Sequence, residues 1–272
     1  MREASGASIV LTILILLLTL VATIGGITVD GLYRDNEFVW LAWWVNDRVT
    51  LYIGMPLLAG SFVATMRGIP SGRLLWLGML WYLVYNYAFY LFGAAFNAHF
   101  LLYVALFILP TLALIAGLME LDISAIRASM PSRTTQRFVG GYMMTWGLML
   151  GTIWATQAAA YLFDGTLPDL LAITGGETHL IAALDLSLVV PSFLLAGWWL
   201  WRGNPWGVVA GVIANVKGSV YCVVLAWGAH AGEQAGYPGG ELLPLWSALV
   251  VLGVLAIVAL LRPLRRPSHR RR

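Results

Sequence analysis

The stretch from Thr178 to His230 reads THLIAALDLSLVVPSFLLAGWWLWRGNPWGVVAGVIANVKGSVYCVVLAWGAH. It contains two apolar segments, each of about 20 residues, which is long enough to cross the hydrocarbon core of a bilayer. We interpret Asp185 in the first segment and Lys217 in the second as the only charged side chains inside apolar sequence. A charge at bilayer depth costs a few kcal/mol or more, so such residues face a bundle interior or a wet cavity. The stretch therefore predicts a transmembrane helical hairpin with a functional site at Asp185 and Lys217.

The composition of the whole chain supports a membrane protein. Its 272 residues are 60% hydrophobic and 11% charged, whereas about a quarter of the residues in soluble globular domains are charged. The net charge of +3 comes from arginines in short loops and in the tail, which indicate membrane orientation rather than nucleic-acid binding. Cys222 is the single cysteine, so no intrachain disulfide or cysteine metal cluster can form. We expect an all-α polytopic bundle in the cytoplasmic membrane of a bacterium.

Eight apolar stretches are long enough to span the membrane. Loops on one side carry most of the arginines, and loops on the other side carry most of the acidic residues. The positive-inside rule therefore places both termini in the cytoplasm. We interpret the first stretch as a retained span rather than a cleaved signal peptide, because it is long for a signal sequence. The predicted spans are 8–27, 49–66, 74–94, 99–118, 138–162, 180–201, 206–229 and 243–261.

Two features recur at an offset of half the chain length. Pro56 precedes an Arg-Gly-x-Pro-x-Gly turn at 67–72, and Pro191 precedes the same turn at 202–207. The pattern predicts two four-helix repeats, 1–135 and 136–262, followed by a disordered basic tail, 263–272, which could touch anionic lipid. Repeats with an even number of spans have parallel orientation, and the ligand site tends to lie between them. The alternative is a tight cytoplasmic turn that arose twice.

The charges distinguish the two predicted repeats. At the offset that relates Pro56 to Pro191, Asp185 aligns with Thr50, Lys217 with Tyr82 and Tyr221 with Asn86. Other polar residues follow helical spacing, as Tyr82, Asn86, Tyr90 and Gly93 do. They indicate either a polar pocket that opens outward or hydrogen bonds between helices, and we favour hydrogen bonds for Asn86 and Gln157. The candidate ligand or ion site is Asp185, Lys217, Tyr221, Asn86, Asn215 and Gln157.

Known catalytic and metal motifs are missing from the sequence. No His pair has the spacing H-E-x-x-H, and no P-loop, serine elbow or dinucleotide fingerprint is present. We predict no metal, no cofactor and no catalytic residue, although an intramembrane enzyme built on Asp185 and Lys217 stays open.

Several short motifs carry a family resemblance. They are Gly31-Leu-Tyr33-Arg34-Asp35, Asn46-Asp47-Arg48-Val-Thr50-Leu51, Tyr85-Asn86-Tyr87-Ala88, Gly93-Ala94-Ala95-Phe96-Asn97 and Leu102-Tyr103-Val-Ala-Leu. With them, and with an Asp in the sixth span and a Val-Lys-Gly in the seventh, the chain resembles an uncharacterised family of bacterial multi-pass membrane proteins of about eight helices. The resemblance covers most of the chain and implies no particular activity.

Three functions are consistent with these residues. The first is a permease for a small solute or for proton-coupled uptake, in which Asp185 titrates or binds a cation and Lys217 keeps it ionised at rest. The second is a membrane sensor or assembly component that uses its outer loops. The third is a retinal-binding photoreceptor with Lys217 as the Schiff-base lysine. Against the third, position 213, four residues before the lysine, is Ile213 rather than an aspartate. We predict the permease.

Overall fold

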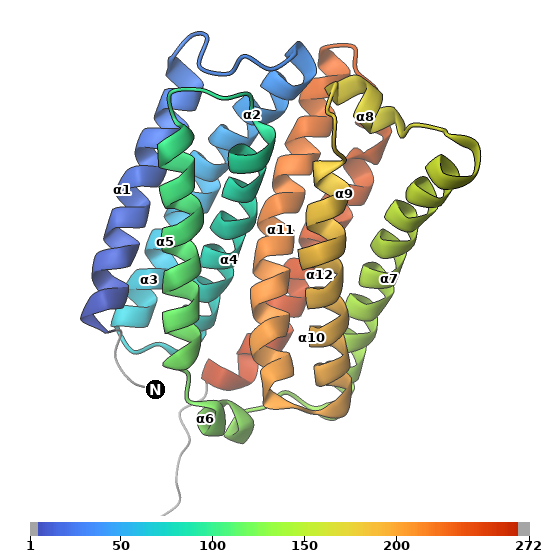
Figure 1. Ribbon diagram of the computed structural model, residues 1–272. Helices are drawn as coiled ribbons and strands as arrows, with labels where there is room; N and C mark the ends of the chain where they lie inside the picture. Colours follow the sequence, from blue (N-terminus) through green and yellow to red (C-terminus); the bar gives the residue numbers. More distant parts are fainter. Residues whose placement is uncertain (1–4, 266–272) are drawn as a thin grey trace, which may run out of the picture.

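The computed structural model describes residues 5–265, which form helices and no strand (Figure 1). Residues 266–272, most of the predicted basic tail, lie outside the described range. An all-α bundle is therefore confirmed. Its elements are α1 (Gly6–Thr28), α2 (Glu37–Val49), η1 (Thr50–Gly54), α3 (Met55–Met66), α4 (Pro70–Gly93), α5 (Phe100–Met119), α6 (Ile123–Ala128), α7 (Arg133–Asp164), α8 (Asp169–Thr174), α9 (Leu180–Leu184), η2 (Asp185–Val189), α10 (Val190–Arg202), α11 (Pro205–Gln234), η3 (Gly240–Leu242), α12 (Leu243–Leu261) and η4 (Arg262–Arg265).

Seven of these helical runs are long and apolar enough to cross a membrane. They correspond to seven of the eight predicted spans, with α2, η1 and α3 forming one run and α9, η2 and α10 another. The remaining predicted span, 138–162, lies in α7, a helix of 32 residues that packs along α10. α7 is long enough to cross a membrane, but its threonines, glycines and glutamines make it less apolar than the seven. The chain is thus a multi-pass membrane protein.

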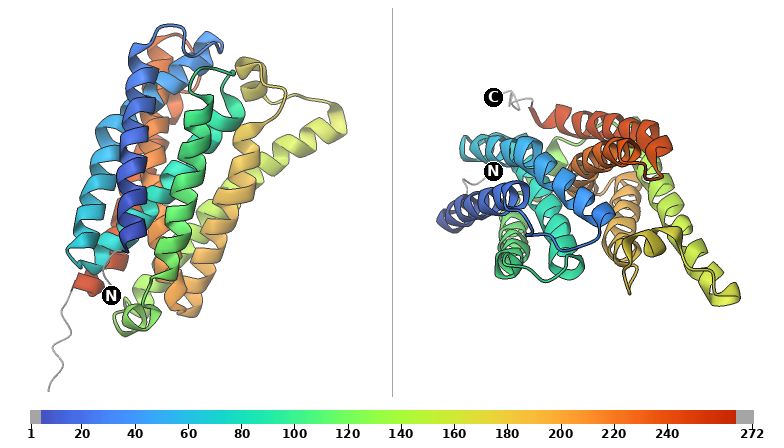
Figure 2. Two further views of the ribbon diagram at one scale, coloured as in Figure 1. Left: turned by 60° about the vertical axis from the view of Figure 1, so that its left-hand side comes forward. Right: turned by 90° about the horizontal axis from the view of Figure 1, so that it is seen from above.

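The helices run up and down between two ends of the bundle. α1 begins at the end where η4 finishes, and α6 lies at that same end (Figure 1). The turn with Arg67, helix α6 with Arg127 and the end of α10 with Arg202 also lie there, as the alternation of arginines predicts. We call this the arginine end and the other the acidic end. At the acidic end α7 leans away from the other helices (Figure 2).

α4 and α11 pack against each other at the centre of the bundle. Large side chains of α4 are buried along its whole length, from Trp76 to Tyr90. Gly78 allows the close approach, because a Cβ added there would lie 2.5 Å from the Cβ of Val216 on α11. The two predicted halves of the chain therefore meet along these two helices.

Two short π-helices interrupt long helices at matching positions. The N–H of Met55 donates to the carbonyl of Thr50, and the N–H of Val190 donates to the carbonyl of Asp185, in each case five residues back. A proline follows immediately, Pro56 or Pro191. Proline has no N–H and its ring crowds the preceding turn, so the helix widens there. Thr50 and Asp185, which begin the two π-helices, are the residues that the sequence repeat aligns.

The two Arg-Gly turns also have the same geometry. Gly68 and Gly203 take the left-handed conformation, with φ of 71° and 74°. At Gly72 a Cβ would lie 2.8 Å from the backbone of Ala64 and Thr65, and at Gly207 it would lie within 2.7 Å of the backbone of Trp199 and Leu200. The repeat aligns these neighbours with each other as well. The agreement supports the duplication, which stays a prediction.

Our interpretation that Asp185 and Lys217 are the only charged side chains within apolar helices is wrong. Asp47 is 2% exposed, and Arg73 is 1% exposed. We placed Asp47 in a loop, but the chain is already helical from Glu37. Helix α2 continues through η1 into α3, and this continuation carries Asp47 into the bundle.

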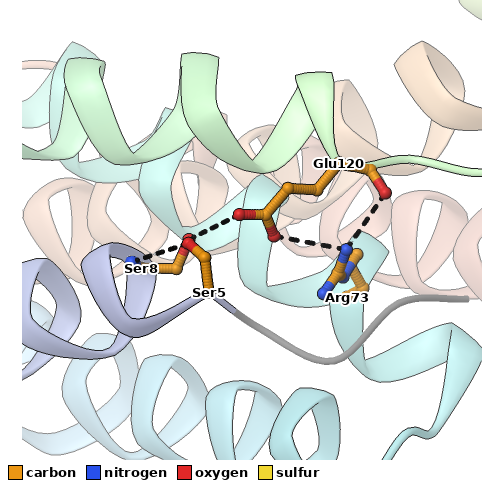
Figure 3. A network of polar contacts seen from close by, with 4 residues as sticks. All are labelled: Ser5, Ser8, Arg73 and Glu120. Carbon is orange, nitrogen blue, oxygen red and sulfur yellow. Dashed lines mark hydrogen bonds and ion pairs between the residues drawn. The ribbon is translucent and has the colours of Figure 1, made fainter.

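Arg73 belongs to a polar network at the arginine end (Figure 3). Its Nη1 lies 3.4 Å from Oε2 of Glu120, just after α5, and donates to the Glu120 carbonyl at 3.2 Å. The hydroxyl of Ser8 on α1 donates to the other carboxylate oxygen of Glu120 at 3.3 Å. The network therefore ties the ends of α1, α4 and α5 together.

Candidate functional site

Asp185 is the first residue of η2, and its carboxylate is buried with 8% of the residue exposed. Its Oδ1 accepts a hydrogen bond of 2.5 Å from the hydroxyl of Tyr85 on α4. Its Oδ2 accepts one of 3.0 Å from the indole N–H of Trp154 on α7. One carboxylate thus joins the first half of the chain, through α4, to two elements of the second half. Burial of a carboxylate is tolerated only with such partners.

Lys217 lies on α11 and is 3% exposed. Its Nζ is 3.2 Å from the centre of the Tyr85 ring and 4.8 Å from the centre of the Tyr221 ring. Lys217 makes no hydrogen bond or salt bridge with any other described residue. The salt bridge among the described residues joins Arg73 and Glu120. Asp185 and Lys217 therefore form no direct ion pair.

Tyr85 lies between the two charges and contacts both. Its ring face attracts the Lys217 ammonium, an interaction of about 2 kcal/mol when desolvated. Its hydroxyl donates to Asp185, and a hydrogen bond to a charged group contributes about 1.5–3 kcal/mol. Phe89 and Tyr221 complete an aromatic wall, with ring centres 5.1 and 5.0 Å from that of Tyr85. The site is an ammonium and a carboxylate joined by one phenol.

A polar line leads from Asp185 toward the acidic end. The Trp154 ring meets the ring of His179 edge to face, with 5.1 Å between their centres. Nε2 of His179 lies 3.3 Å from Oε1 of Gln157, and its Nδ1 accepts from the N–H of Ala182 at the start of α9. Burial lowers the pKa of His179. Its neutral form fits these contacts, because a protonated Nδ1 cannot accept a hydrogen bond.

The structure brings some of the predicted site residues together and separates others. Tyr221 adjoins Lys217, and Gln157 reaches the edge of the site through His179. Asn215 instead donates to the carbonyl of Gly211 on its own helix. Asn86 accepts from Asn46, so it does not contact Asp185 or Lys217.

The polar stripe on α4 faces α2 and η1. Tyr82 bonds the hydroxyl of Thr50 at 2.7 Å, and the Tyr90 hydroxyl donates to Asp47 at 2.9 Å. With the Asn46–Asn86 bond, the stripe makes interhelical hydrogen bonds, which is the interpretation we favoured for Asn86. Asn86 and Asn215 thus have hydrogen-bond partners other than Asp185 and Lys217, and their place in the site stays a prediction.

Tyr85 and Trp154 were missed by sequence reasoning. Both are aromatic residues in helices rich in aromatics, and no spacing distinguishes them from membrane-interface anchors. Two surface hollows lie at residues 29–34 and 96–101 and at Arg133 and Trp201, and neither is lined by Asp185 or Lys217. The described residues contain no cluster of His, Cys, Asp or Glu that could hold a metal.

Comparisons with known proteins add no family to this description. No family model, no curated protein and no solved structure matches the chain. The multi-pass helical architecture stands on the structure itself. The resemblance to a bacterial family stays a prediction.

Proposed function

We propose that this protein is a proton-coupled permease for a small solute, in the cytoplasmic membrane of a bacterium, with its site at Asp185 and Lys217. One observation supports it above the others: a carboxylate and an ammonium are buried in a membrane bundle and meet through the single ring of Tyr85. Ionisable groups inside membrane bundles usually belong to ion paths or proton relays. Arg73 and Glu120 form a structural salt bridge at the arginine end, whereas Asp185 and Lys217 form no direct ion pair.

Asp185 is the proton-accepting residue of the proposed cycle. In its ionised form Asp185 accepts hydrogen bonds from the hydroxyl of Tyr85 and the indole N–H of Trp154. It also balances the charge of Lys217, which lies over the Tyr85 ring. A bound proton removes that negative charge and weakens both charge-assisted hydrogen bonds. Lys217 then lacks a counter-charge in a dry site. The protonated state therefore favours a different arrangement of the helices around Tyr85.

The halves of the chain can move relative to each other at this site. Tyr85 belongs to the first predicted repeat, and Trp154, Asp185 and Lys217 belong to the second. The matching π-helices and turns support the two parallel repeats, and in transporters of that type the halves rock about a site between them. Since Asp185 and Lys217 are both buried, the arrangement described here corresponds to an occluded state.

Proteoliposomes that contain a pH-sensitive dye test the proposal. Solutes of four classes, namely organic cations, monocarboxylates, amino acids and polyols, are added outside while internal pH is followed. The wild-type protein should move protons with at least one class. Asp185→Asn keeps the size of the side chain, leaves one acceptor oxygen for Tyr85 and Trp154, and cannot ionise, so it should abolish this movement.

Asp30→Asn is the matched control, because Asp30 is exposed in the loop after α1 and its loss should leave transport unchanged. Folding of each variant is checked by gel filtration and circular dichroism. Proton movement by folded Asp185→Asn at the wild-type rate would contradict the assignment of Asp185. A wild-type protein that moves protons with none of the four classes would contradict the permease itself.

A further inference from the structure

A second buried carboxylate, Asp47, lies in the first half of the chain and has no part in the proposed transport site. It is 2% exposed on α2. Its Oδ2 accepts from the hydroxyl of Tyr33 at 2.6 Å, and its Oδ1 accepts from the hydroxyl of Tyr90 at 2.9 Å. Tyr33 comes from the loop between α1 and α2, so this loop covers the carboxyl group from the acidic end.

Among the described residues, Asp47 has no salt-bridge partner. The titratable and charged groups near it are Tyr33 of the loop, Tyr82, Tyr87 and Tyr90 of α4, Tyr103 of α5 and Arg48 of its own helix. The Arg48 guanidinium lies 3.1 Å from the centre of the Trp44 ring instead of bonding Asp47. Within the described residues, no Lys, Arg or His forms a salt bridge with Asp47.

Space around the carboxyl group excludes a metal ion. A Cβ added to Gly26 of α1 would lie 1.9 Å from Oδ2 of Asp47 and 2.5 Å from the Tyr33 hydroxyl, so the α1 backbone presses on the pair. Ca²⁺ and Mg²⁺ need six or more oxygen ligands at about 2.0–2.6 Å. The two tyrosine hydroxyls already bond the oxygens directly. A proton is the one cation that needs no additional volume.

We propose that Asp47 is a proton-binding site and carries a proton on Oδ1 as a neutral carboxylic acid at neutral pH. In that form Oδ1 donates to the Tyr90 oxygen, the Tyr90 hydroxyl donates to the carbonyl of Trp43, and Oδ2 still accepts from Tyr33. An ionised carboxylate buried without a salt bridge is costly, and such a group usually takes up a proton instead. Hydrogen bonds from two neutral phenols replace only part of the hydration that burial removes. Asp185 differs from Asp47 in its surroundings, because the Lys217 ammonium lies over the ring of Tyr85, whose hydroxyl donates to Asp185.

The loop that carries Tyr33 separates the proton on Asp47 from the acidic end of the bundle. The Tyr33 hydroxyl bonds the carboxyl group directly, and the remainder of its loop is pinned by contacts of Asp35 with Trp43 and with the N–H of Ala95. Release of the proton therefore requires this loop to lift. The site is a proton store beneath a loop, whether or not the chain transports a solute.

Infrared spectroscopy of the purified full-length protein at neutral pH tests the inference. A protonated carboxyl group has a C=O stretching band separate from the carboxylate bands. This band should be present in the wild-type protein and in Asp185→Asn and should be lost in Asp47→Asn. Loss of carboxylate absorption alone in Asp47→Asn would overturn the inference.

If Asp47→Asn does not fold, Tyr33→Phe tests whether Asp47 is protonated. It keeps the carboxyl group and removes one hydrogen bond, so the C=O band should shift to higher frequency. Tyr237→Phe is the matched control, because Tyr237 is a loop tyrosine that packs on Phe38 with 5.2 Å between ring centres. If the frequency of the protonated-carboxyl band is the same in Tyr33→Phe as in the wild-type protein, the inference is overturned. These spectra need no transport, so their failure is distinguishable from failure of the permease proposal.

Discussion

The Nζ of Lys217 lies 3.2 Å from the centre of the Tyr85 ring, and no carboxylate intervenes. A cation on a ring face keeps its charge in a dry site without fixing a partner in a salt bridge. Such a contact can be exchanged for another at lower cost than a buried ion pair, whose disruption costs about 3–5 kcal/mol. The relationship therefore suits a lysine that changes partners.

Tyr85→Phe separates the two roles of the tyrosine. Phenylalanine keeps the ring under Lys217 but loses the hydroxyl that donates to Asp185. The free energy of unfolding should fall by about 1.5–3 kcal/mol, the contribution of a hydrogen bond to a charged group. Tyr85→Leu should lower it further, because the cation then also loses its ring. Denaturant unfolding in micelles measures both, with exposed Tyr161→Phe as the control. Equal stability of Tyr85→Phe and the wild-type protein would show that the hydroxyl contributes nothing.

The multi-pass architecture could be predicted from the sequence because it depends on length and hydropathy. The two π-helices were not predicted, although Pro56 and Pro191 follow them closely in the sequence. The start of α2 could not be predicted, because Glu37, Asn46 and Asp47 look like loop residues. Only the structure shows that Asn46 and Asp47 have partners on α4. Polar residues in a membrane helix are tolerated when another helix satisfies them, and sequence does not show that partner.

The site shows the same limit. Asp185 and Lys217 stand out because charges are rare in apolar segments. Tyr85 precedes Asn86 on α4, but the four-residue spacing of Tyr82, Asn86 and Tyr90 led us to choose Asn86 instead. The difference of one residue turns a side chain by about 100° around a helix. Because of this rotation, Tyr85 faces Asp185 whereas Asn86 faces Asn46.

Gly72→Ala and Gly207→Ala should have similar effects. Each added Cβ would lie under 3.0 Å from backbone atoms of the preceding helix, in equivalent positions. Backbone cannot move as readily as a flexible side chain, so each substitution should lower the free energy of unfolding by about 1–3 kcal/mol. Gly60→Ala is the control, because open space surrounds its Cβ and alanine favours a helix by about 1 kcal/mol. Destabilisation at one turn only would contradict the predicted duplication.

Removal of the Arg73 side-chain charge should destabilise the arginine end of the bundle. Arg73→Met leaves Glu120 without its salt bridge and the Glu120 carbonyl without a donor. Breaking a buried pair costs about 3–5 kcal/mol, and the upper part of this range is not expected because Glu120 is 19% exposed. Hydrogen exchange should increase at the ends of α1, α4 and α5. Arg67→Met is the control, since Arg67 is exposed. Unchanged exchange in Arg73→Met would show that the network does not hold these ends.

Stability should decrease as the pH falls below the ordinary pKa of histidine, through His179. Burial lowers the pKa of His179 in the folded protein, so the folded state favours the neutral ring more than the unfolded state does. The stability this provides is complete above about pH 6.5, the unfolded value, and is lost as the pH falls through the lower folded value. Protonation also removes the acceptor for the N–H of Ala182 at the start of α9. Unfolding temperatures of the wild-type protein and His179→Asn, measured from pH 8 to pH 5, check this. Asparagine can cap the helix at both pH values, so the decrease should be smaller in the variant. An equal decrease in both proteins would assign it to other groups, and His230→Asn, at an exposed position on α11, shows the background.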